Sequence, residues 1–316
     1  MTKLNRRAFV KVSSAVVAIC TTRKFTKVAD GAEDPMDFDV GKQIYKSLKW
    51  GMIRTDGSTL DKFTMLKELG YDGVELDSPE GVDKREALQA SRETGLPIEG
   101  IVNSTHWRIR HSDPDPAIRA QALDNMRTAL RDAKYVGADS VLLVPGKITD
   151  PETENHDQVW ERSIVEIRKV LPLAEDLEIK ILIENVGNGF CYDPNQFAQY
   201  IDEINSPWIG VHFDIGNHIW VSPPAEWIRI LGKRIRKLDI KDRTKMREKT
   251  KIGEGDADWP SVRKALQEIG YRGWAAAEVS GGDRDRLAEI LQRMNRVVGK
   301  SDGRPPKQLP GATSEE

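Results

Sequence analysis

Four acidic residues stand at the ends of short apolar runs, and their types and spacing could build one chemical site. They are Glu184 after Ile181-Leu182-Ile183, Asp214 after Val211-His212-Phe213, Asp239 after Leu238, and Glu278 after Ala275-Ala276-Ala277. Carboxylates gathered in one place repel each other and resist burial unless a cation compensates them. An oxygen-rich ligand set suits Mn²⁺, Mg²⁺ or Co²⁺ better than Zn²⁺, which usually recruits His or Cys. The four acids therefore predict a divalent metal site, with Mn²⁺ as the first choice.

These acids can meet only if the elements that carry them share one edge, and the hydrophobic pattern supplies such elements. From about residue 44, apolar runs alternate with amphipathic stretches, which indicates repeated βα units and a parallel sheet. Strands are expected at 47–53, 73–76, 98–102, 140–144, 180–184, 209–214, 235–240 and 275–278. Helices are expected at 60–69, 84–94, 117–136, 159–177, 194–204, 224–231, 259–269 and 284–297.

This series of eight strands and eight helices has the size of a single (β/α)8 TIM barrel, whose chemistry lies at the carboxyl ends of the strands. A doubly wound open sheet is the competing architecture. No Gly-x-Gly-x-x-Gly follows the first expected strand, which removes support for a dinucleotide-binding sheet. The sequence therefore predicts the barrel, with Glu184, Asp214, Asp239 and Glu278 at one rim.

Five short segments carry a more specific signal: Gly70–Leu76, Ile183–Asn185, Phe213–Asn217, Ile240–Asp242 and Ile252–Trp259. They resemble the xylose isomerase-like TIM-barrel superfamily of sugar (phosphate) isomerases and epimerases. Hexulose- and xylulose-phosphate 3-epimerases and hydroxypyruvate isomerase-type proteins are among its members. The similarity covers about residues 45–297, and the run from Gly253 to Trp259 is its most distinctive part.

The resemblance implies that Glu184, Asp214 and Glu278 bind a divalent metal. The family's fourth ligand is a histidine on strand seven, and this sequence has Asp239 there, in Asp239-Ile240-Lys241-Asp242. Asp239 still offers oxygen, but it has a shorter reach and adds a negative charge. A histidine that is often found three residues after the strand-six aspartate is Asn217 here, with His218 beside it.

The resemblance also implies a mechanism, in which the metal coordinates a carbonyl and a neighbouring hydroxyl of the substrate and makes the adjacent C–H more acidic. Glu184 and Glu278 then remove and return a proton through an enediolate, as general base and acid. The outcome is 3-epimerisation or aldose–ketose isomerisation of a small ketose or keto-sugar. The same chemistry becomes β-elimination when a leaving group lies beta to the acidified carbon, so a keto-glycoside lyase is an alternative. A non-catalytic exported sugar-binding barrel is a second alternative, since Asp239 weakens the metal site.

Seven further residues near the expected strand ends are candidates to bind substrate: Glu75, His106, Trp107, Asn217, His218, Lys241 and Glu254. We interpret His106 as a hydrogen-bonding group and Trp107 as a pocket wall, although a solvated loop histidine is equally compatible with the sequence. Glu75 could orient a hydroxyl or form an ion pair with Arg54. Glu254, between two glycines, is expected to cover the mouth of the site on a flexible loop.

The charge distribution excludes a nucleic-acid partner. The formal net charge is -2, but residues 1–30 hold seven of the basic residues and one acidic residue. The remaining 41 basic and 49 acidic residues leave an acidic body, which has no general attraction for phosphate backbones. Five histidines are also too few for a multi-zinc DNA-repair endonuclease. The expected partner is a small sugar or keto-sugar, and formation of a homo-oligomer is left open.

The N-terminus resembles a twin-arginine export signal. Asn5-Arg6-Arg7-Ala8-Phe9 precedes an apolar run from Val12 to Cys20, which is too short to span a membrane comfortably. The alternative is a basic disordered N-terminus. We predict an export signal at 1–30, a linker at 31–43, the barrel at 44–298 and a disordered tail at 299–316. The protein would then be periplasmic or otherwise extracytoplasmic, without stable membrane insertion, and a free ketose, hydroxypyruvate-like acid or 3-keto-sugar would suit it better than a sugar phosphate.

Overall fold

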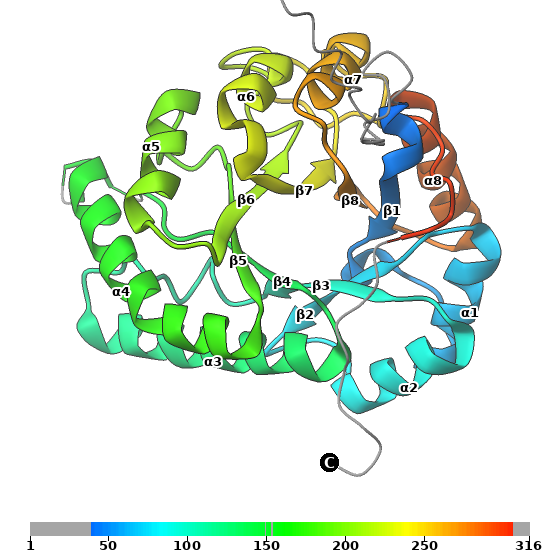
Figure 1. Ribbon diagram of the computed structural model, residues 1–316, viewed down its shortest axis with the longest axis horizontal. Coiled ribbons are helices and arrows are strands. Elements are labelled where there is room, and N and C mark those ends of the chain that lie inside the picture. The colour runs from blue at the N-terminus through cyan, green and yellow to red at the C-terminus, as the bar shows by residue number, and fades with distance from the viewer. Residues whose placement is uncertain (1–38, 149, 153, 306–316) are drawn as a thin grey trace, which may run out of the picture. The chain divides into compact units, whose positions relative to one another are not determined.

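Eight parallel strands run around a common centre, with the helices outside them, in a computed structural model that describes residues 39–305 except 149 and 153 (Figure 1). The predicted export signal, the linker before residue 39 and the tail after residue 305 lie outside the described residues. Neighbouring strands follow the order β1-β8-β7-β6-β5-β4-β3-β2. An isolated parallel bridge between Lys49 and Glu75 joins the two ends of this series, just beyond β1. The predicted single (β/α)8 TIM barrel is confirmed.

The strands and helices alternate along the chain. The strands are β1 Ile44–Leu48, β2 Val74–Ser78, β3 Ile98–Asn103, β4 Ser140–Leu143, β5 Lys180–Glu184, β6 Ile209–Asp214, β7 Ile235–Ile240 and β8 Gly273–Ala277. The α-helices are α1 Thr59–Leu69, α2 Lys84–Thr94, α3 Pro116–Val136, α4 His156–Leu177, α5 Pro194–Ile204, α6 Pro224–Leu231, α7 Trp259–Glu268 and α8 Arg284–Val298. Within residues 39–305, the described part of the chain, three short 3-10 helices are η1 Val40–Gln43, η2 Trp50–Met52 and η3 Gly232–Arg234.

Local sequence explains where several of the helices start and stop. Ser58 and Asn155 form capping boxes at the starts of α1 and α4, so their side chains satisfy backbone N–H groups that the helix leaves free. Gly70 and Gly137 end α1 and α3 in the left-handed conformation, which glycine adopts at little cost. Each of these turns leads within a few residues into the next strand, which keeps the βα units short.

The first and last strands differ from their predicted bounds, and both differences affect the site. β1 ends at Leu48, because the chain turns into η2, where Trp50 packs against Phe63 with ring centroids 5.7 Å apart. Lys49 therefore stands directly after the end of the strand rather than within it. β8 ends at Ala277, so Glu278 belongs to the following loop.

The folded unit extends beyond residues 44–298 on both sides. In the described part of the predicted linker, η1 is capped by Asp39 and buries Val40. In the described part of the predicted tail, Asp302 N–H donates to the carbonyl of Lys42, and Ser301 Oγ donates to Asp72. These contacts connect both segments to the barrel.

The interior of the barrel beneath the rim holds a cluster of charged side chains. Glu99 accepts a hydrogen bond from Ser47 Oγ at 2.8 Å and also binds the ammonium of Lys237. Lys237 lies 3.1 Å from Asp139 as well. Burial raises the pKa of Glu99 to about 7. A Cβ at Gly100 would lie 2.6 Å from Lys237 Nζ and 3.0 Å from Glu75 Oε1, so the glycine lets both side chains approach the strand closely.

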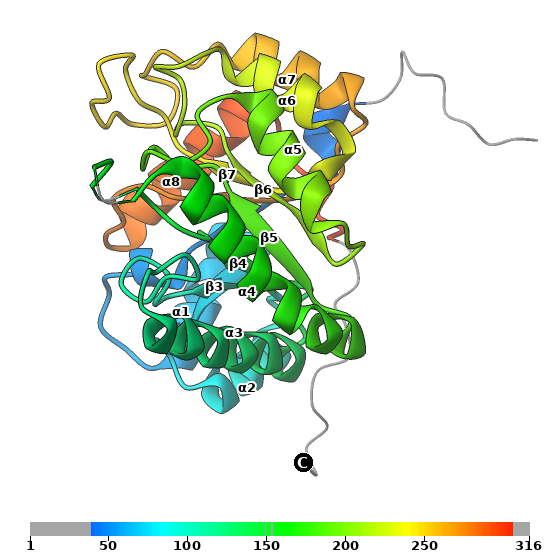
Figure 2. The ribbon, with the colours of Figure 1, turned by 90° about the vertical axis from the view of Figure 1, so that its left-hand side faces the viewer.

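The loops that follow the strands gather at one end of the barrel. Figure 2 shows the long β7–α7 loop projecting at the same end as the β8–α8 loop, away from the flank that α3, α4 and α5 cover. Among the helices of the described chain, none combines the length and apolar character that a membrane crossing needs. The functional site is therefore sought at the loop end of the barrel.

Candidate active site

The four predicted carboxylates meet at the loop end of β5 to β8. Glu184 and Asp214 are the last residues of their strands, Asp239 is the last but one of β7, and Glu278 follows β8. Each offers an oxygen atom, and these atoms all lie within 4.8 Å of one another. Asp214 and Asp239 are fully buried, whereas the Glu278 side chain keeps 34% of its surface exposed. Glu278 therefore stands at the boundary between the cluster and solvent.

Two lysines compensate part of this negative charge. Lys241 Nζ lies 2.8 Å from Asp214 Oδ2 and 2.5 Å from Glu278 Oε2. Lys49 Nζ lies 3.0 Å from Asp239 Oδ2 and 3.4 Å from Glu75 Oε2. Burial alone would lower the pKa of each lysine, but the surrounding carboxylates reverse this effect and raise both pKa values above the usual range. Both ammonium groups are therefore charged.

Asp239 is shared between two groups of candidate ligands. His212 Nε2 lies 3.1 Å from Asp239 Oδ1, and Glu75, His212 and Asp239 form a second buried trio whose ligand atoms lie within 4.8 Å of one another. Burial favours the neutral acid, yet His212 and Lys49 outweigh it and hold the pKa of Asp239 well below its usual range. Asp239 therefore stays ionised at the centre of the site.

The two glutamates have different surroundings. Burial and the nearby charges of Glu278 and Asp239 raise the pKa of Glu184 well above its usual value. Asn217 Nδ2 donates a hydrogen bond to Glu184 Oε1 at 3.0 Å and another to the carbonyl of Asn185. Burial acts in the same direction on Glu278, but Lys49 and Lys241 outweigh it and lower its pKa. Two carboxyl groups whose surroundings separate their pKa values are suited to opposite proton-transfer roles.

The donor set fits a hard divalent cation. Asp214 Oδ2, Glu278 Oε2 and both carboxylate oxygens of Asp239 are buried, and their partners within ion-pair distance are Lys241, Lys49 and His212. Burial raises the pKa of Asp214 to about 8 in spite of the nearby Lys241 ammonium. A divalent cation among these oxygens would relieve the excess negative charge, and oxygen ligands are those that Mg²⁺ and Mn²⁺ prefer.

Several predicted residues share one cavity with the two glutamates. This cavity has a volume of about 350 Å³, and its lining includes Glu184, Glu278, Trp107, Asn217 and Lys241. Trp107 is 45% exposed and forms part of the wall, as expected for a residue that contacts a ligand. The structure therefore brings together side chains from the loops after β3, β5, β6, β7 and β8.

His106 lies next to Trp107, with ring centroids 5.4 Å apart, and is 4% exposed. Its Nδ1 accepts a hydrogen bond from the Val144 N–H at 3.3 Å. Burial lowers the pKa of His106 to about 3, so the ring is neutral and carries its proton on Nε2. His106 is thus a buried hydrogen-bond donor rather than a solvated loop residue.

Three predicted binding residues lie elsewhere. His218 is buried and stacks on Trp227 with ring centroids 4.5 Å apart. Glu254 is exposed and pairs with Arg293 at 2.7 Å. Glu75 lies beneath the cluster, and its ion-pair partner is Lys49 rather than Arg54. None of the three lines the 350 Å³ cavity.

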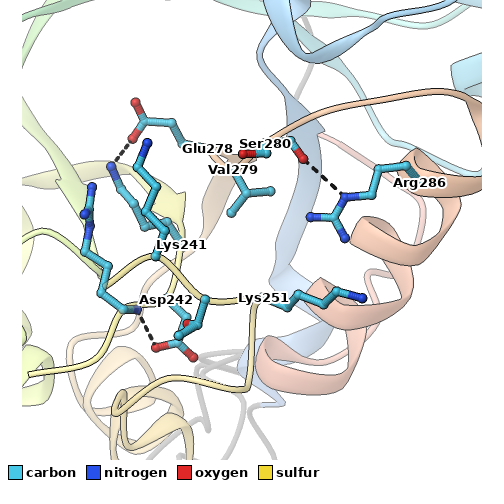
Figure 3. A pocket seen from close by; sticks show the side chains of 10 residues that line it. Lys241, Asp242, Lys251, Glu278, Val279, Ser280 and Arg286 are labelled. Atoms are coloured by element: carbon cyan, nitrogen blue, oxygen red, sulfur yellow. Dashed lines mark hydrogen bonds and ion pairs between the residues drawn. The ribbon is translucent and has the colours of Figure 1, made fainter. Parts of the chain in front are cut away.

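A second cavity of about 470 Å³ shares Lys241, Arg243 and Glu278 with the first. Figure 3 shows Glu278, Lys241 and Ser280 around it, with Lys251 and Arg286 at its side. Lys49, Trp220 and Arg247 were not predicted from the sequence as site residues. The guanidinium of Arg247 lies 3.5 Å from the ring centroid of Trp220, and both side chains line the first cavity.

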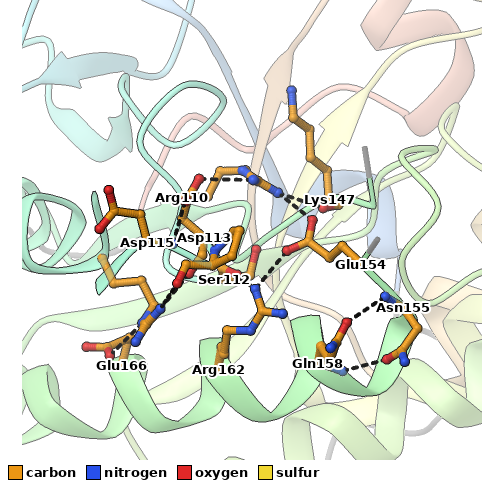
Figure 4. A network of polar contacts seen from close by, with 12 residues as sticks. Arg110, Ser112, Asp113, Asp115, Lys147, Glu154, Asn155, Gln158, Arg162 and Glu166 are labelled. Carbon is orange, nitrogen blue, oxygen red and sulfur yellow. Dashed lines mark hydrogen bonds and ion pairs between the residues drawn. The ribbon is translucent and has the colours of Figure 1, made fainter. Parts of the chain in front are cut away.

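A buried ionic network fixes the loop that carries His106 and Trp107 (Figure 4). Glu154 accepts from Arg110 Nη1 at 3.0 Å and from Arg162 Nη1 at 2.9 Å. Arg110 also donates to the carbonyl of Lys147 at 2.9 Å. The loop after β3 is thereby tied to the loop after β4 and to α4.

Comparison with known proteins agrees with this geometry. Residues 63–297 match the family model of the xylose isomerase-like TIM barrel. L-ribulose-5-phosphate 3-epimerase UlaE of Escherichia coli is 25% identical over 255 residues, covering 76% of this chain and 89% of the relative. Among solved structures, D-allulose 3-epimerase from Methylomonas sp. in complex with D-allulose has a TM-score of 0.65 at 19% identity, covering 82% of this chain and 95% of the other. A D-tagatose 3-epimerase-like protein has a TM-score of 0.69 at 22% identity, covering 80% and 98%.

Proposed function

This chain belongs to the xylose isomerase-like TIM barrel family, and we propose on that premise that it is a divalent-metal-dependent sugar isomerase. The proposed reaction moves a proton at the carbon next to a carbonyl, through an enediolate, on a small ketose or keto-sugar. The related UlaE is an L-ribulose-5-phosphate 3-epimerase, and one structurally similar protein is a D-allulose 3-epimerase. Another structurally similar protein is described as D-tagatose 3-epimerase-like. Ketose 3-epimerisation is therefore the first reaction that we assign.

The main support for this proposal is the position of two glutamates: Glu184 and Glu278 line the same cavity and belong to one cluster of carboxylates. Glu184, Asp214, Asp239 and Glu278 would hold the metal. A divalent cation, when bound, supplies Lewis-acid polarisation of the substrate's carbonyl and hydroxyl oxygens. Lys241 and Lys49 would release some carboxylate oxygens for this purpose, and they offset part of the cluster's negative charge before the cation binds.

Glu278 and Glu184 take opposite roles in the proposed proton transfer. Glu278 is the ionised partner, held by Lys241 at 2.5 Å, and accepts the proton from the carbon next to the carbonyl. Glu184 is oriented by Asn217 and supplies a proton from the other side of that carbon. In the reverse direction the two exchange roles. Trp107 and Trp220 form cavity walls that pack against the sugar and limit the access of water.

Product analysis with metal-loaded protein tests this proposal. Free ketohexoses and ketopentoses, their phosphates and 3-keto-glycosides are incubated with the protein and Mn²⁺, and products are identified by NMR. A C3 epimer supports the proposal, and an aldose supports the isomerase form of the same chemistry. An unsaturated product with a released leaving group would identify a lyase instead, and a ligand that binds without any product would indicate a binding protein. Export, predicted from residues 1–30, remains part of the proposal and is tested by localising the full-length protein.

A further inference from the structure

The β7–α7 loop carries a regular run of basic residues. Every second residue is basic from the end of β7 onward: Lys241, Arg243, Lys245, Arg247, Lys249 and Lys251. In a solvated loop, such charges would be expected to pair with acids nearby or to point into solvent. Lys245, Arg247 and Lys249 are exposed, whereas Lys241 is buried.

The acidic residue within the first part of this loop is not available to neutralise it. Asp242 is buried, and its carboxylate accepts from Gly253 N–H at 3.0 Å, Ala257 N–H at 3.3 Å and Trp259 Nε1 at 2.9 Å. A Cβ at Gly255 would lie 2.2 Å from Asp242 Oδ1, so the glycine permits this close packing. Asp242 thus holds the loop in one shape, and its carboxylate forms hydrogen bonds with backbone and indole N–H groups rather than an ion pair with a basic side chain of the loop.

Two of the basic residues line a cavity and form no ion pair with another described residue. Arg243 and Lys249 form an isolated antiparallel bridge, and both line the 470 Å³ cavity, whose lining also includes the acidic residues Asp242 and Glu278. Within the described residues, neither side chain lies within ion-pair distance of a carboxylate, and the polar contact of the Arg243 side chain is with the Arg247 carbonyl at 3.2 Å. By contrast, Lys251 and Arg286 both bind Glu289.

Arg243 also connects this cavity to the reacting groups. It lines both the 470 Å³ cavity and the 350 Å³ cavity, as do Lys241 and Glu278. Arg247 lines the smaller cavity and is held over the Trp220 ring. One ligand can therefore reach Glu278 with one end and the Arg243–Lys249 pair with the other.

Resting on the function proposed above, we propose that Arg243 and Lys249 form a subsite for an oxyanion at the end of the substrate remote from the reacting carbons. The substrate is then an acidic ketose, either a ketose phosphate or a keto-sugar acid. The planar guanidinium of Arg243 offers two parallel donors, which matches the geometry of phosphate and carboxylate groups. Lys249 adds a second positive charge from the adjacent position of the bridge.

Binding and kinetics on the full chain loaded with Mn²⁺ test this subsite. The probes are a neutral ketopentose, the corresponding 5-phosphate and a ketose acid of the same length, each titrated by calorimetry. We expect wild-type protein to bind one of the two anionic probes at least tenfold more tightly than the neutral ketose. The preferred anion distinguishes the phosphate from the carboxylate. Equal affinity for all three probes would overturn the proposal.

Substitutions in the β7–α7 loop test which residues cause the preference for an anionic probe. Arg243→Gln and Lys249→Gln are each expected to lower affinity for the preferred anionic probe about tenfold and to raise KM more than they change kcat. Arg243→Lys should retain part of the affinity, because it keeps the charge without the paired donors. Lys245→Gln is the matched control, since Lys245 is exposed on the same loop and lines neither cavity. An equal loss in Lys245→Gln would show a general effect of loop charge and would contradict a built subsite.

The same data separate this proposal from the proposed reaction. Anion binding that depends on Arg243 but is followed by no turnover would retain the subsite and reject the isomerase. Turnover of a neutral ketose without any anion preference would retain the isomerase and reject the subsite. Thermal unfolding of each variant establishes that it is folded, and Lys249→Gln provides the test if Arg243→Gln is not.

Discussion

The Lys49 ammonium lies 3.0 Å from Asp239 Oδ2, at the position where the family resemblance implies a strand-seven histidine. A neutral histidine brings no charge to a metal site, whereas an aspartate brings one negative charge. The Lys49–Asp239 pair brings a positive and a negative charge, so its sum equals that of the histidine. Lys49 follows β1 and Asp239 lies on β7, and β8 separates these strands in the sheet. Lys49 therefore compensates the negative charge that an aspartate introduces in place of a histidine, and it does so from a different part of the barrel.

Replacing Lys49 should show how far the stability of the site depends on the Lys49–Asp239 ion pair. In Lys49→Met, Asp239 and Glu75 lose their shared ammonium, and breaking a buried ion pair typically lowers stability by about 3–5 kcal/mol. We expect denaturant unfolding with chelator present to show a loss of this size. Mn²⁺ should restore part of the lost stability, so the stabilisation by Mn²⁺ should be larger in Lys49→Met than in wild type.

Lys42→Met, which removes an exposed lysine, is the control for this experiment. Equal stability of Lys49→Met and wild type in chelator would contradict the account of Asp239. A similar loss in Lys42→Met would also count against it, because that loss could not come from the site.

Buried His111 should make stability depend on pH. It is fully buried, both ring nitrogens lack a hydrogen-bond partner in the described structure, and burial lowers its pKa to about 4. The unfolded chain binds a proton near pH 6.5 that the folded protein takes up only near pH 4. Stability is therefore lost as the pH falls through this range, and His111 accounts for about 2 kcal/mol of the loss between pH 7 and pH 5.

His111→Leu removes the titrating group while keeping an apolar side chain in its place. We expect the urea unfolding free energy of this variant to fall by about 2 kcal/mol less than that of wild type between pH 7 and pH 5. Parallel pH profiles for the two proteins would show that His111 does not contribute as its burial implies.

The Glu154 network should contribute to stability and to the order of the site. Glu154→Ala leaves Arg110 and Arg162 without their shared carboxylate, and we expect about 3 kcal/mol of destabilisation. Because Arg110 holds the loop that carries His106, KM should rise as well. Glu152→Ala, two residues away and exposed, is the control for both measurements. Equal unfolding free energies for the two variants would contradict a structural role for the network.

The strands that carry the acids could be predicted closely from the sequence. β5, β6 and β7 have the predicted bounds, because each is a short apolar run between helix-ending and loop-forming residues. Glu184, Asp214 and Asp239 were therefore placed correctly at strand ends. Lys49 was not found, because the apolar residues around it extend past the true end of β1, and the turn depends on Trp50 packing against Phe63.

Pairing between distant residues explains the other differences. Adjacent residues such as Asn217 and His218 look equally suited to bind a ligand, but only packing against Trp227 shows that His218 points elsewhere. Likewise, the basic β7–α7 loop resembles a solvated segment in sequence. The ordered shape of this loop depends on Asp242, which accepts a hydrogen bond from Trp259 Nε1, and this is a tertiary contact.

Solvent proton exchange tests the central claim most directly. Metal-loaded wild type, Glu278→Gln and the surface control Glu268→Gln are incubated in D₂O with Mn²⁺ and the ketose panel, and deuterium at the carbon next to the carbonyl is followed by NMR. We predict incorporation by wild type and Glu268→Gln, and a rate lower by about 10²–10⁴-fold in Glu278→Gln, which loses the proton acceptor. Exchange at an undiminished rate in Glu278→Gln, or no exchange by folded, metal-loaded wild type with any sugar of the panel, would contradict the proposed enediolate chemistry.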